Sequence, residues 1–329
     1  MLIINLSQNK SAINEYLSST LLKVIKENLE KNKKIILYLN KRWEFSSLIC
    51  TECSYIYKCD FCDNSFSVHK YPEKLICHIC WHNINIPIKC IKCNKNTLKK
   101  VWIWTQQIET IIKKIFTKNK IFRFDTDAVK NKKQKEEALK KLKEADIIVG
   151  TKMITTWFDF KNIWLIGVIL LEQELLIPKY DTEEKVISNI KQLIGRWWRK
   201  GEKTKIIIQT FIAKNDIVKT ITQDNYKEFF IKTLEERKNF LYPPFIQMAT
   251  LEYRHKKKQD AKDFMIKIKD KLDKKNTENR FDIILISKSF KKYNQFFYKI
   301  IIKWDNIRNF VKNIKNDIFK NSNLVVIFE

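Results

Sequence analysis

The chain has 329 residues, enough for two or three domains with at least one hydrophobic core. Its formal net charge of +27, from 64 Lys and Arg against 37 Asp and Glu, favours a polyanionic partner such as nucleic acid over an acidic small molecule. The longest apolar run, residues 163–171, has nine residues, against the roughly 20 that span a bilayer. The N-terminus also lacks a signal-peptide pattern. We therefore expect a cytoplasmic protein with no membrane partner.

The first part of the chain alternates between helical and strand patterns. A helix is predicted over residues 20–33, a strand over 34–40, and a cysteine-rich segment from about 46 to 96 interrupts this order. Regular patterns then resume with strand-like runs at 100–104, 121–124, 146–149, 164–171 and 205–211, and with helices at 106–118, 131–145 and about 182–194. Strands that alternate with helices predict a parallel α/β sheet.

The pattern changes after residue 212, and the Pro pair in Tyr242-Pro243-Pro244 marks a break. A strand at 249–253, a helix at 258–273, strands at 281–287 and 297–303, a helix at 306–314 and a strand at 324–328 follow. This order predicts a small α+β domain. The expected domains are an α/β lobe over 1–45 and 97–215, a cysteine insertion over 46–96, and a C-terminal domain over 216–329.

All eight cysteines lie in four Cys-x-x-Cys pairs: Cys50/Cys53, Cys59/Cys62, Cys77/Cys80 and Cys90/Cys93. Two such pairs supply the four thiolates of a tetrahedral zinc site, so the pattern predicts two structural Zn²⁺ ions. A disulfide framework would need an oxidising compartment and usually a small secreted domain. Redox catalysis by one pair would leave three pairs unexplained. The spacing does not decide which pairs share an ion.

Three further segments are candidates for chemistry at the carboxyl edge of the sheet. Gly150, Thr151 and Lys152 follow a buried strand and suit a phosphate-binding turn, although such turns are common in α/β proteins. Arg196 and Arg199 are three residues apart, so on a helix they would present two guanidinium groups to one polyanion. A pair of surface salt bridges explains these arginines equally well. The third segment, residues 101–105, leads from a strand into a helix.

In their order, these segments resemble the C-terminal portion of the PriA family of bacterial replication-restart helicases, also called primosomal protein N-prime. The segment LYLNKRWEF resembles a strand and turn of the family, and the four cysteine pairs have the family's spacing. WIWTQQIE stands where the family has Gly-x-Gly-Thr-Glu-x-x-Glu, GTKMITTWFDF resembles helicase motif V, QLIGRWWRKG resembles motif VI, and ERKNFLYPPF resembles the entry to the C-terminal domain. The resemblance covers almost the whole chain.

The resemblance implies a RecA-like second helicase lobe with an inserted two-zinc module and a C-terminal DNA-binding domain. It implies one zinc site of Cys50, Cys53, Cys90 and Cys93, and another of Cys59, Cys62, Cys77 and Cys80. It implies that Arg196 and Arg199 act at the ATP phosphates, and that nucleotide and DNA are coupled through Gly150, Thr151, Lys152, Gln192 and Gly195. The implied partners are branched or single-stranded DNA, single-strand binding protein and other primosome proteins.

The sequence contains no Gly-x-x-x-x-Gly-Lys-Ser/Thr loop and no Asp-Glu-x-His box, the parts that hold ATP and Mg²⁺ in the family's first lobe. We therefore expect an ATP-dependent 3′–5′ DNA helicase only in combination with such a lobe, and no ATP hydrolysis by this chain alone. Two alternatives are a non-enzymatic zinc-stabilised DNA-binding or primosome scaffold protein, and an inert gene fragment.

The tryptophans suggest a separate hypothesis. The chain has four Gly and nine Trp, whereas about 23 Gly would be ordinary at this length. Seven of the tryptophans stand where the family has, or commonly has, glycine: Trp43, Trp81, Trp102, Trp104, Trp157, Trp198 and Trp304. We hypothesise that UGA codons, which the source cell reads as glycine, are written here as tryptophan. The alternative is nine genuine core or stacking tryptophans.

Overall fold

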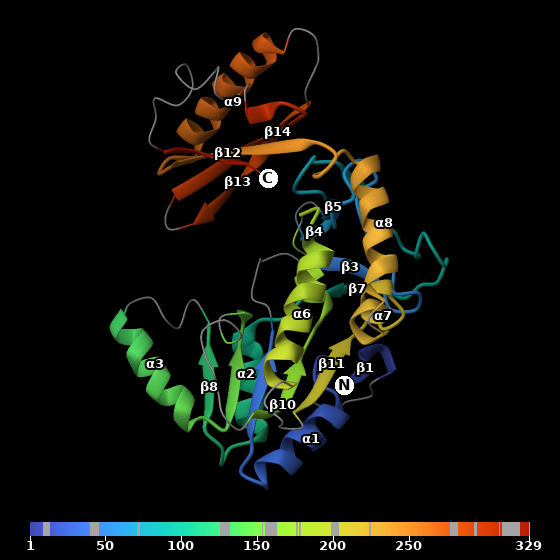
Figure 1. Cartoon of the computed structure of the whole chain (residues 1–329), viewed down its shortest axis with the longest axis vertical. Coiled ribbons are helices and arrows are strands. Elements are labelled where there is room, and N and C mark those ends of the chain that lie inside the picture. Colours follow the sequence, from blue (N-terminus) through green and yellow to red (C-terminus); the bar gives the residue numbers. More distant parts are fainter. Residues whose placement is uncertain are drawn as a thin grey trace. The chain divides into compact units, whose positions relative to one another are not determined.

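The structure, a computed structural model, is drawn in Figure 1. It describes residues 1–8, 14–39, 46–70, 73–125, 132–152, 154, 163–175, 177, 179–198, 204–223, 225–276, 282–292, 295–308, 310 and 323–328. Within these ranges, the side chains of residues 132–135, 139, 196–198 and 285–292 are outside the description. None of the described helices is long and apolar enough to cross a membrane.

A six-stranded parallel sheet forms the centre of the first part of the chain (Figure 1). Its strands, in spatial order, are β1 (Leu2–Asn5), β11 (Lys205–Thr210), β10 (Ile163–Val168), β2 (Lys34–Tyr38), β9 (Ile147–Gly150) and β8 (Ile121–Phe124). All neighbours pair in parallel. The predicted α/β class is confirmed, and this sheet is the architecture expected of the RecA-like lobe. Strand β1, which pairs with β11 at the sheet edge, is not among the predicted elements.

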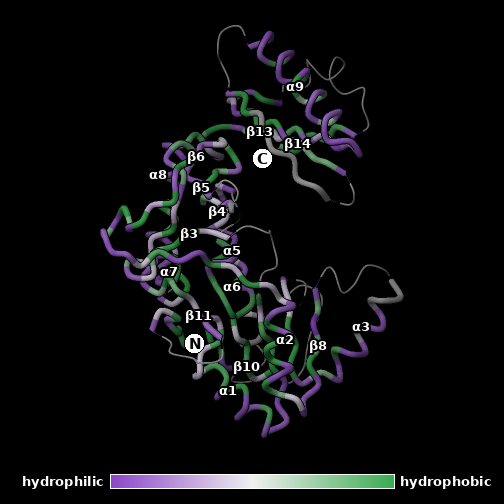
Figure 2. Tube along the Cα trace, turned by 180° about the vertical axis from the view of Figure 1, so that it is seen from behind, coloured by the Kyte–Doolittle hydropathy of each residue, from purple (hydrophilic) through white to green (hydrophobic). Residues whose placement is uncertain are grey.

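Helices flank these strands. The 3-10 turn η1 (Leu6–Gln8) follows β1, and the helices are α1 (Ser19–Leu29), α2 (Thr105–Ile115), α3 (Lys132–Glu144), α5 (Glu172–Leu175), α6 (Thr182–Trp198), α7 (Asp216–Gln223) and α8 (Tyr226–Asn239). Helix α1 begins where the hydroxyl of Ser18 accepts a hydrogen bond from the Leu21 amide at 3.1 Å. Its apolar residues are buried against β2 and β10. Helix α3 is largely hydrophilic, as Figure 2 shows.

The predicted strand-like run at 100–104 is not part of the parallel sheet. Strand β7 (Leu98–Val101) instead pairs antiparallel with β3 (Ser47–Cys50) in a separate two-stranded sheet. The two strands flank the cysteine-rich segment, so their pairing closes its base. Residues 102–104 then lead directly into α2. Within the segment lie the short strands β4 (Ser67–Lys70), β5 (Glu73–Ile76) and β6 (Asn83–Asn85).

The C-terminal part has a four-stranded antiparallel sheet in the order β13 (Asp282–Lys292), β14 (Gln295–Trp304), β12 (Gln247–His255) and β15 (Leu324–Phe328). Helix α9 (Lys258–Lys275) packs on it through residues at helical spacing: Ala261, Met265, Ile268 and Leu272. The predicted α+β order is confirmed, although most of the helix expected at 306–314 lies outside the described residues.

Contacts group the chain into two compact units. The first comprises residues 1–57, 67–73 and 86–226, and the second comprises 58–66, 74–85 and 227–329. The cysteine-rich segment is therefore shared between the units. This grouping follows contacts rather than domain borders, and the predicted borders stay predictions.

Candidate metal centres

All four Cys-x-x-Cys loops have the same backbone conformation. In each loop the amide of the first cysteine donates to the carbonyl five residues later, at 2.8–2.9 Å. The residue after the second cysteine has a positive φ in every case: 61° at Ser54, 52° at Asp63, 64° at Trp81 and 56° at Asn94. This repeated turn points the two thiols of each loop in the same direction, as a shared metal ion requires. We call the loops knuckles one to four in chain order.

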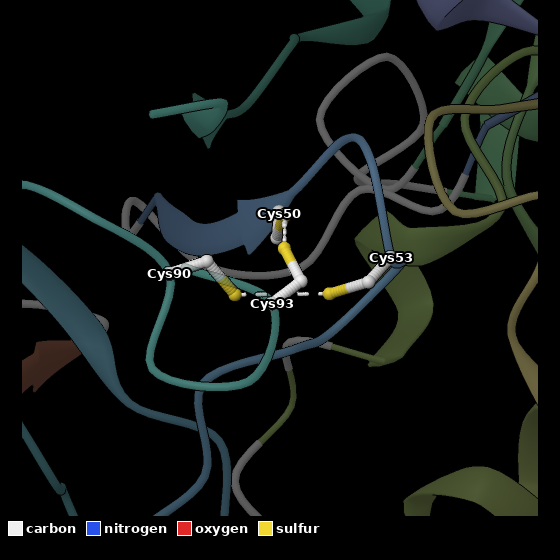
Figure 3. A group of neighbouring side chains, drawn as sticks. All are labelled: Cys50, Cys53, Cys90 and Cys93. Carbon is white, nitrogen blue, oxygen red and sulfur yellow. Dashed lines mark hydrogen bonds between the residues drawn. The ribbon is translucent and has the colours of Figure 1, made fainter. Parts of the chain in front are cut away.

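Knuckles one and four form the first cluster, which Figure 3 shows. The Sγ atoms of Cys50 and Cys93 are 3.6 Å apart, and those of Cys53 and Cys90 are 3.7 Å apart. Four thiolates at about 2.3 Å from one Zn²⁺ ion would have sulfurs about 3.8 Å apart. The observed spacing fits such a tetrahedron and is much longer than the bond of about 2.05 Å in a disulfide.

Knuckles two and three form the second cluster. The Sγ distances are 3.4 Å between Cys59 and Cys80, 3.4 Å between Cys62 and Cys77, and 3.7 Å between Cys62 and Cys80. All eight cysteines are free thiols. The grouping of the cysteines is the one that the family resemblance implies. Among the residues that the structure describes, each cluster offers four sulfur ligands and no other group, which suits a closed structural site rather than a catalytic one.

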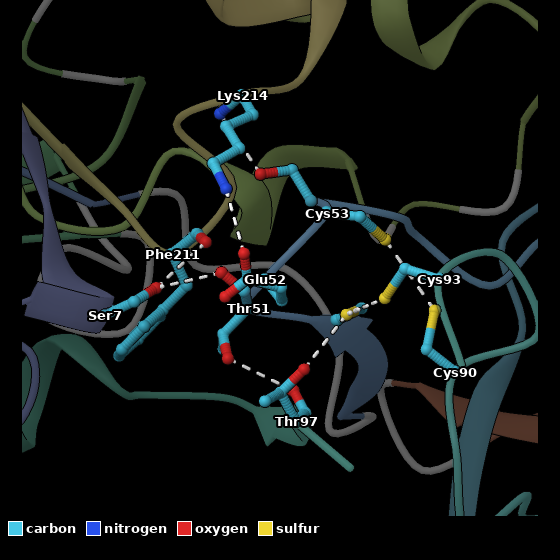
Figure 4. A network of polar contacts seen from close by, with 11 residues as sticks. Ser7, Thr51, Glu52, Cys53, Cys90, Cys93, Thr97, Phe211 and Lys214 are labelled. Atoms are coloured by element: carbon cyan, nitrogen blue, oxygen red, sulfur yellow. Dashed lines mark hydrogen bonds and ion pairs between the residues drawn. The ribbon is translucent and has the colours of Figure 1, made fainter. Parts of the chain in front are cut away.

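Knuckle one is fastened to the carboxyl edge of the parallel sheet (Figure 4). The Ser7 hydroxyl, just beyond β1, lies 3.4 Å from the carbonyl oxygen of Thr51 and 3.3 Å from that of Phe211, which follows β11. The Lys214 amide donates to the buried hydroxyl of Ser54 at 3.1 Å. Because these contacts come from loops after two sheet strands, the first metal cluster has a fixed attachment to the lobe.

The second cluster is tied in the same way to the C-terminal part of the chain. The hydroxyl of Tyr242 donates to the Cys62 carbonyl at 2.8 Å, and the Asn64 amide group donates to the same carbonyl at 2.7 Å. The ammonium group of Lys303, on β14, lies 3.9 Å from the centre of the Tyr242 ring. Burial raises the pKa of Tyr242 and lowers the pKa of Lys303. Each cluster thus belongs to a different compact unit.

The carboxyl edge of the parallel sheet also holds buried acidic groups that the sequence analysis did not single out. Glu172 follows β10, is fully buried, and accepts hydrogen bonds from the Thr210 hydroxyl at 2.7 Å and the Phe211 amide at 2.8 Å. Burial raises its pKa to about 7. Asp125, after β8, is also fully buried and accepts from the Thr105 hydroxyl at 2.9 Å. The sequence pattern that could have identified Glu172 is a charged residue directly after a long apolar run.

Gly150 ends β9 and Thr151 follows it at the same edge, and close packing explains the glycine. A Cβ on Gly150 would lie 2.5 Å from the Phe124 carbonyl oxygen and 2.3 Å from the Ile154 side chain. Thr151 is buried, whereas Lys152 is exposed. Only Lys152 of these three therefore presents an accessible side chain. The assigned role of this turn in coupling nucleotide and DNA stays a prediction.

Helix α6 carries the remaining predicted residues. Gln192 is exposed and lies near Ser188, and Gly195 has open space where a Cβ would stand. The backbone of Arg196 is helical, but its side chain is outside the description, and Arg199 lies outside the described residues. Their roles at ATP stay predictions.

A hollow of about 690 Å³ lies beside the N-terminal end of α2. Trp102 and Trp104 line it and pack edge to face, with ring centres 4.8 Å apart. Gln173 of α5 donates to the Ile103 carbonyl at 2.7 Å and so fixes this turn against the carboxyl edge of the sheet. Trp102, Ile103 and Trp104 belong to the segment that resembles the family's Gly-x-Gly-Thr-Glu motif.

No family model matches the chain. Its relatives among known proteins include replication restart proteins called PriA. The protein of Bacillus subtilis is 30% identical over 240 residues, which cover 72% of this chain and 30% of that protein. The protein of Borreliella burgdorferi is 30% identical over 308 residues, which cover 88% of this chain and 46% of that protein. The protein of Chlamydia trachomatis is 28% identical over 312 residues, which cover 92% of this chain and 41% of that protein.

Among solved structures, domain 2 of the DEAD-box helicase Mss116p bound to an RNA duplex is similar with a TM-score of 0.36 and 14% identity, over 85% of this chain and 78% of that one. The chain spans less than half the length of each curated relative named here. It is a relative of the replication restart protein PriA and corresponds to the C-terminal portion of that protein.

Proposed function

We propose that this chain is the C-terminal part of an ATP-dependent DNA helicase that recognises stalled replication forks and restarts replication by primosome assembly. The observation that carries the proposal is the sequence relationship to PriA, which extends over 88% of the chain in one relative. The parallel sheet and the two four-cysteine clusters support it, because they are the parts that the resemblance implies.

ATP would be bound between this sheet and a first lobe that carries a Walker loop. Arg196 and Arg199 would then stabilise negative charge developing on the γ-phosphoryl group, and Mg²⁺ would be held by the first lobe. Gly150, Thr151, Lys152, Gln192 and Gly195 would couple the nucleotide to DNA. The direction of movement along DNA would be 3′–5′, as the resemblance implies. Because this sequence contains no Walker loop, the chain would not hydrolyse ATP alone.

Each cysteine cluster would hold one Zn²⁺ ion. Four thiolates and the observed sulfur spacing of 3.4–3.7 Å suit this ion. Since neither cluster has an open position, zinc would supply structural support rather than a nucleophile or Lewis acid. The proposed partners are branched or single-stranded DNA, single-strand binding protein and other primosome proteins, in the cytoplasm.

DNA binding by the purified chain is the first test. We expect binding to forked DNA that weakens steeply with salt and depends little on base sequence, since a lysine-rich surface contacts mainly phosphates. An inert fragment would not bind. Affinity that does not change with salt would contradict the proposal.

Catalysis is tested by fusing the first lobe of a PriA relative to this chain and measuring DNA-stimulated ATP hydrolysis. Replacing Arg196 with Ala should lower kcat by about 10³-fold, which is the scale of such arginines in other phosphoryl-transfer enzymes. Arg308→Ala, in an exposed position of the C-terminal unit, is the matched control and should leave kcat unchanged. A non-enzymatic scaffold protein, the alternative reading, would bind DNA yet give a fusion without DNA-stimulated hydrolysis.

A further inference from the structure

The two knuckles of the first cluster differ in their surroundings. Knuckle one, with Thr51 and Glu52 between its cysteines, is fastened to the sheet lobe through Ser7 and Lys214. Knuckle four and the residues on either side of it, 88–95, are exposed except at Cys90 and Cys93. Knuckle one therefore anchors the cluster to the lobe, whereas knuckle four is exposed to solvent.

Knuckle four exposes two large apolar side chains. Ile88 is 81% exposed and Ile91 is 66% exposed, and Ile88 is the most exposed large apolar side chain among the described residues. Single exposed apolar residues are common on protein surfaces. Here, however, two such residues stand three positions apart on one short loop. With only two residues between Cys90 and Cys93, the loop is too short to fold Ile91 back into an interior.

Lysines surround these isoleucines. Lys89, Lys92 and Lys95 are exposed and make no ion pair with any residue in the described part of the chain. The sequence has no Asp or Glu between Glu73 and Glu109. The segment is therefore positive throughout, and no nearby acidic residue in the sequence offsets this charge. Such a surface is complementary to a chain of phosphates.

Hydrogen bonds to a buried tyrosine also hold the backbone of knuckle four in place. The buried Tyr57 accepts a hydrogen bond from the Ile91 amide at 3.2 Å, and its hydroxyl lies 3.5 Å from the Lys89 carbonyl oxygen. The Cys90 amide donates to the Lys95 carbonyl at 2.9 Å. Because the backbone is fixed at both ends, little conformational entropy is lost when the loop binds a partner.

We infer that knuckle four is a contact site for single-stranded DNA, in which Ile88 and Ile91 pack against unpaired bases while Lys89, Lys92 and Lys95 bind the phosphates on either side. The inference rests on the proposed function. An unpaired strand offers both chemistries that the loop presents, since its base faces are open and its backbone is anionic. A blunt duplex hides its base faces in the stack, so it can use only the lysines. Apolar side chains that pack against or between bases are known in other DNA-binding proteins.

The test uses the full chain and fluorescence anisotropy with a short poly(dT) strand and a blunt duplex. The double substitution Ile88→Ser with Ile91→Ser should weaken binding to poly(dT) about tenfold, leave duplex binding unchanged, and leave the salt dependence unchanged. Replacing Lys89, Lys92 and Lys95 with Gln should weaken binding to both DNAs. For poly(dT), the slope of log affinity against log salt should fall by about 2.

Two matched controls use exposed residues elsewhere. Ile231→Ser replaces a 51% exposed isoleucine of α8, and the triple change of Lys23, Lys26 and Lys31 to Gln removes three exposed lysines on and just after α1. The apolar control should bind poly(dT) like the parent, and the lysine control should lower the salt slope by less than the knuckle variant. Metal content must stay at the parental value in every variant.

Parental affinity for poly(dT) in both knuckle variants would overturn the inference. In that case, DNA binding by the parent with its salt dependence intact would leave the proposed function standing and would direct attention to a protein partner for this loop. Absence of DNA binding by the parent itself would contradict the proposed function and the inference together.

Discussion

Lys214 and Glu52 form an ion pair of 3.1 Å across 162 residues of sequence, and this pair joins knuckle one to the loop after β11. Both side chains are more than half exposed, so solvent screens the attraction. Beside it, the buried Ser54 hydroxyl accepts from the Lys214 amide, and the Asn215 side chain donates to the Ser54 carbonyl at 3.2 Å. The buried contacts, rather than the ion pair, should hold the first metal cluster on the lobe.

The first prediction separates these two kinds of contact. Glu52→Gln should lower the free energy of unfolding by less than about 1 kcal/mol, as is usual for an exposed ion pair. Ser54→Ala should lower it by about 1–3 kcal/mol because it leaves the Lys214 amide without its acceptor. Urea unfolding of the metal-loaded chain measures both. A larger loss in Glu52→Gln than in Ser54→Ala would reverse this ranking.

The second prediction concerns metal content. The purified chain should hold two zinc ions, and Cys93→Ser or Cys62→Ser should each remove one of them while the other stays bound, because the two clusters lie in different compact units. Mass spectrometry of the metal content under reducing conditions measures this. Loss of both ions from either variant, or a single ion in the parent, would contradict independent sites.

The third prediction uses Glu172, whose folded pKa of about 7 lies above its ordinary value of 4.5. Between these values the folded state binds more protons than the unfolded state, so stability falls as pH rises from about 5 to 8. The fall is on the order of 3 kcal/mol. Glu172→Gln keeps an acceptor for Phe211 and provides a donor toward Thr210, so it should remove this part of the pH dependence.

Urea unfolding at pH 5 and pH 8 tests the third prediction. The Glu172→Gln variant should match the parent at pH 5 and exceed its stability at pH 8. Glu30→Gln, which changes an exposed carboxyl at the end of α1, is the control and should keep the parental pH profile. An unchanged profile in Glu172→Gln would show that another group controls the pH dependence.

The fourth prediction is that Trp81 is glycine in the natural protein. Trp81 has a φ of 64°, in the left-handed region that favours glycine, and its indole nitrogen is buried without a hydrogen-bond partner among the described residues. The equivalent residues of the other knuckles are Ser54, Asp63 and Asn94. The five tryptophans with described side chains are all half-buried, and none belongs to the buried core: Trp81, Trp102, Trp104, Trp164 and Trp304.

Two measurements check this prediction. Trp81→Gly should be at least as stable as the parent, because relief of the left-handed backbone is worth about 1–2 kcal/mol. Trp164→Gly, within strand β10, should instead lose about 1 kcal/mol or more. Peptide mass spectrometry of the protein from its natural source is decisive, and a tryptophan at position 81 in that material would refute the hypothesis.

Continuous apolar runs made most of the sheet predictable. Residues 121–124 and 205–211 match β8 and β11 closely because each strand contains a short apolar run that is bounded by polar residues. Strand β1 escaped prediction because its four residues at the chain start carry no periodic pattern, and its pairing with β11 supplies the missing information. Strand β7 was placed in the wrong sheet because its partner, β3, lies on the far side of the cysteine-rich segment.

The candidate site was predictable in its residue types but not in its arrangement. Two-residue spacers identified all eight cysteines as candidate metal ligands. Four pairs can be matched in three ways, and only a family resemblance or a structure distinguishes them. The attachment through Ser7 and Ser54 was not predictable, because hydrogen bonds between a loop and a distant strand end leave no pattern in sequence. The burial of Glu172 likewise depends on β10 and β11 lying side by side.

The two metal clusters are nested in sequence, since residues 59–80 of the second lie between the two halves of the first, Cys53 and Cys90. During synthesis the inner cluster is therefore complete when Cys80 has left the ribosome, and the outer one when Cys93 follows. The loop after β11 that receives knuckle one, with Lys214, is made more than a hundred residues later. The nascent chain thus carries both sets of thiols well before the lobe that anchors the first set is complete.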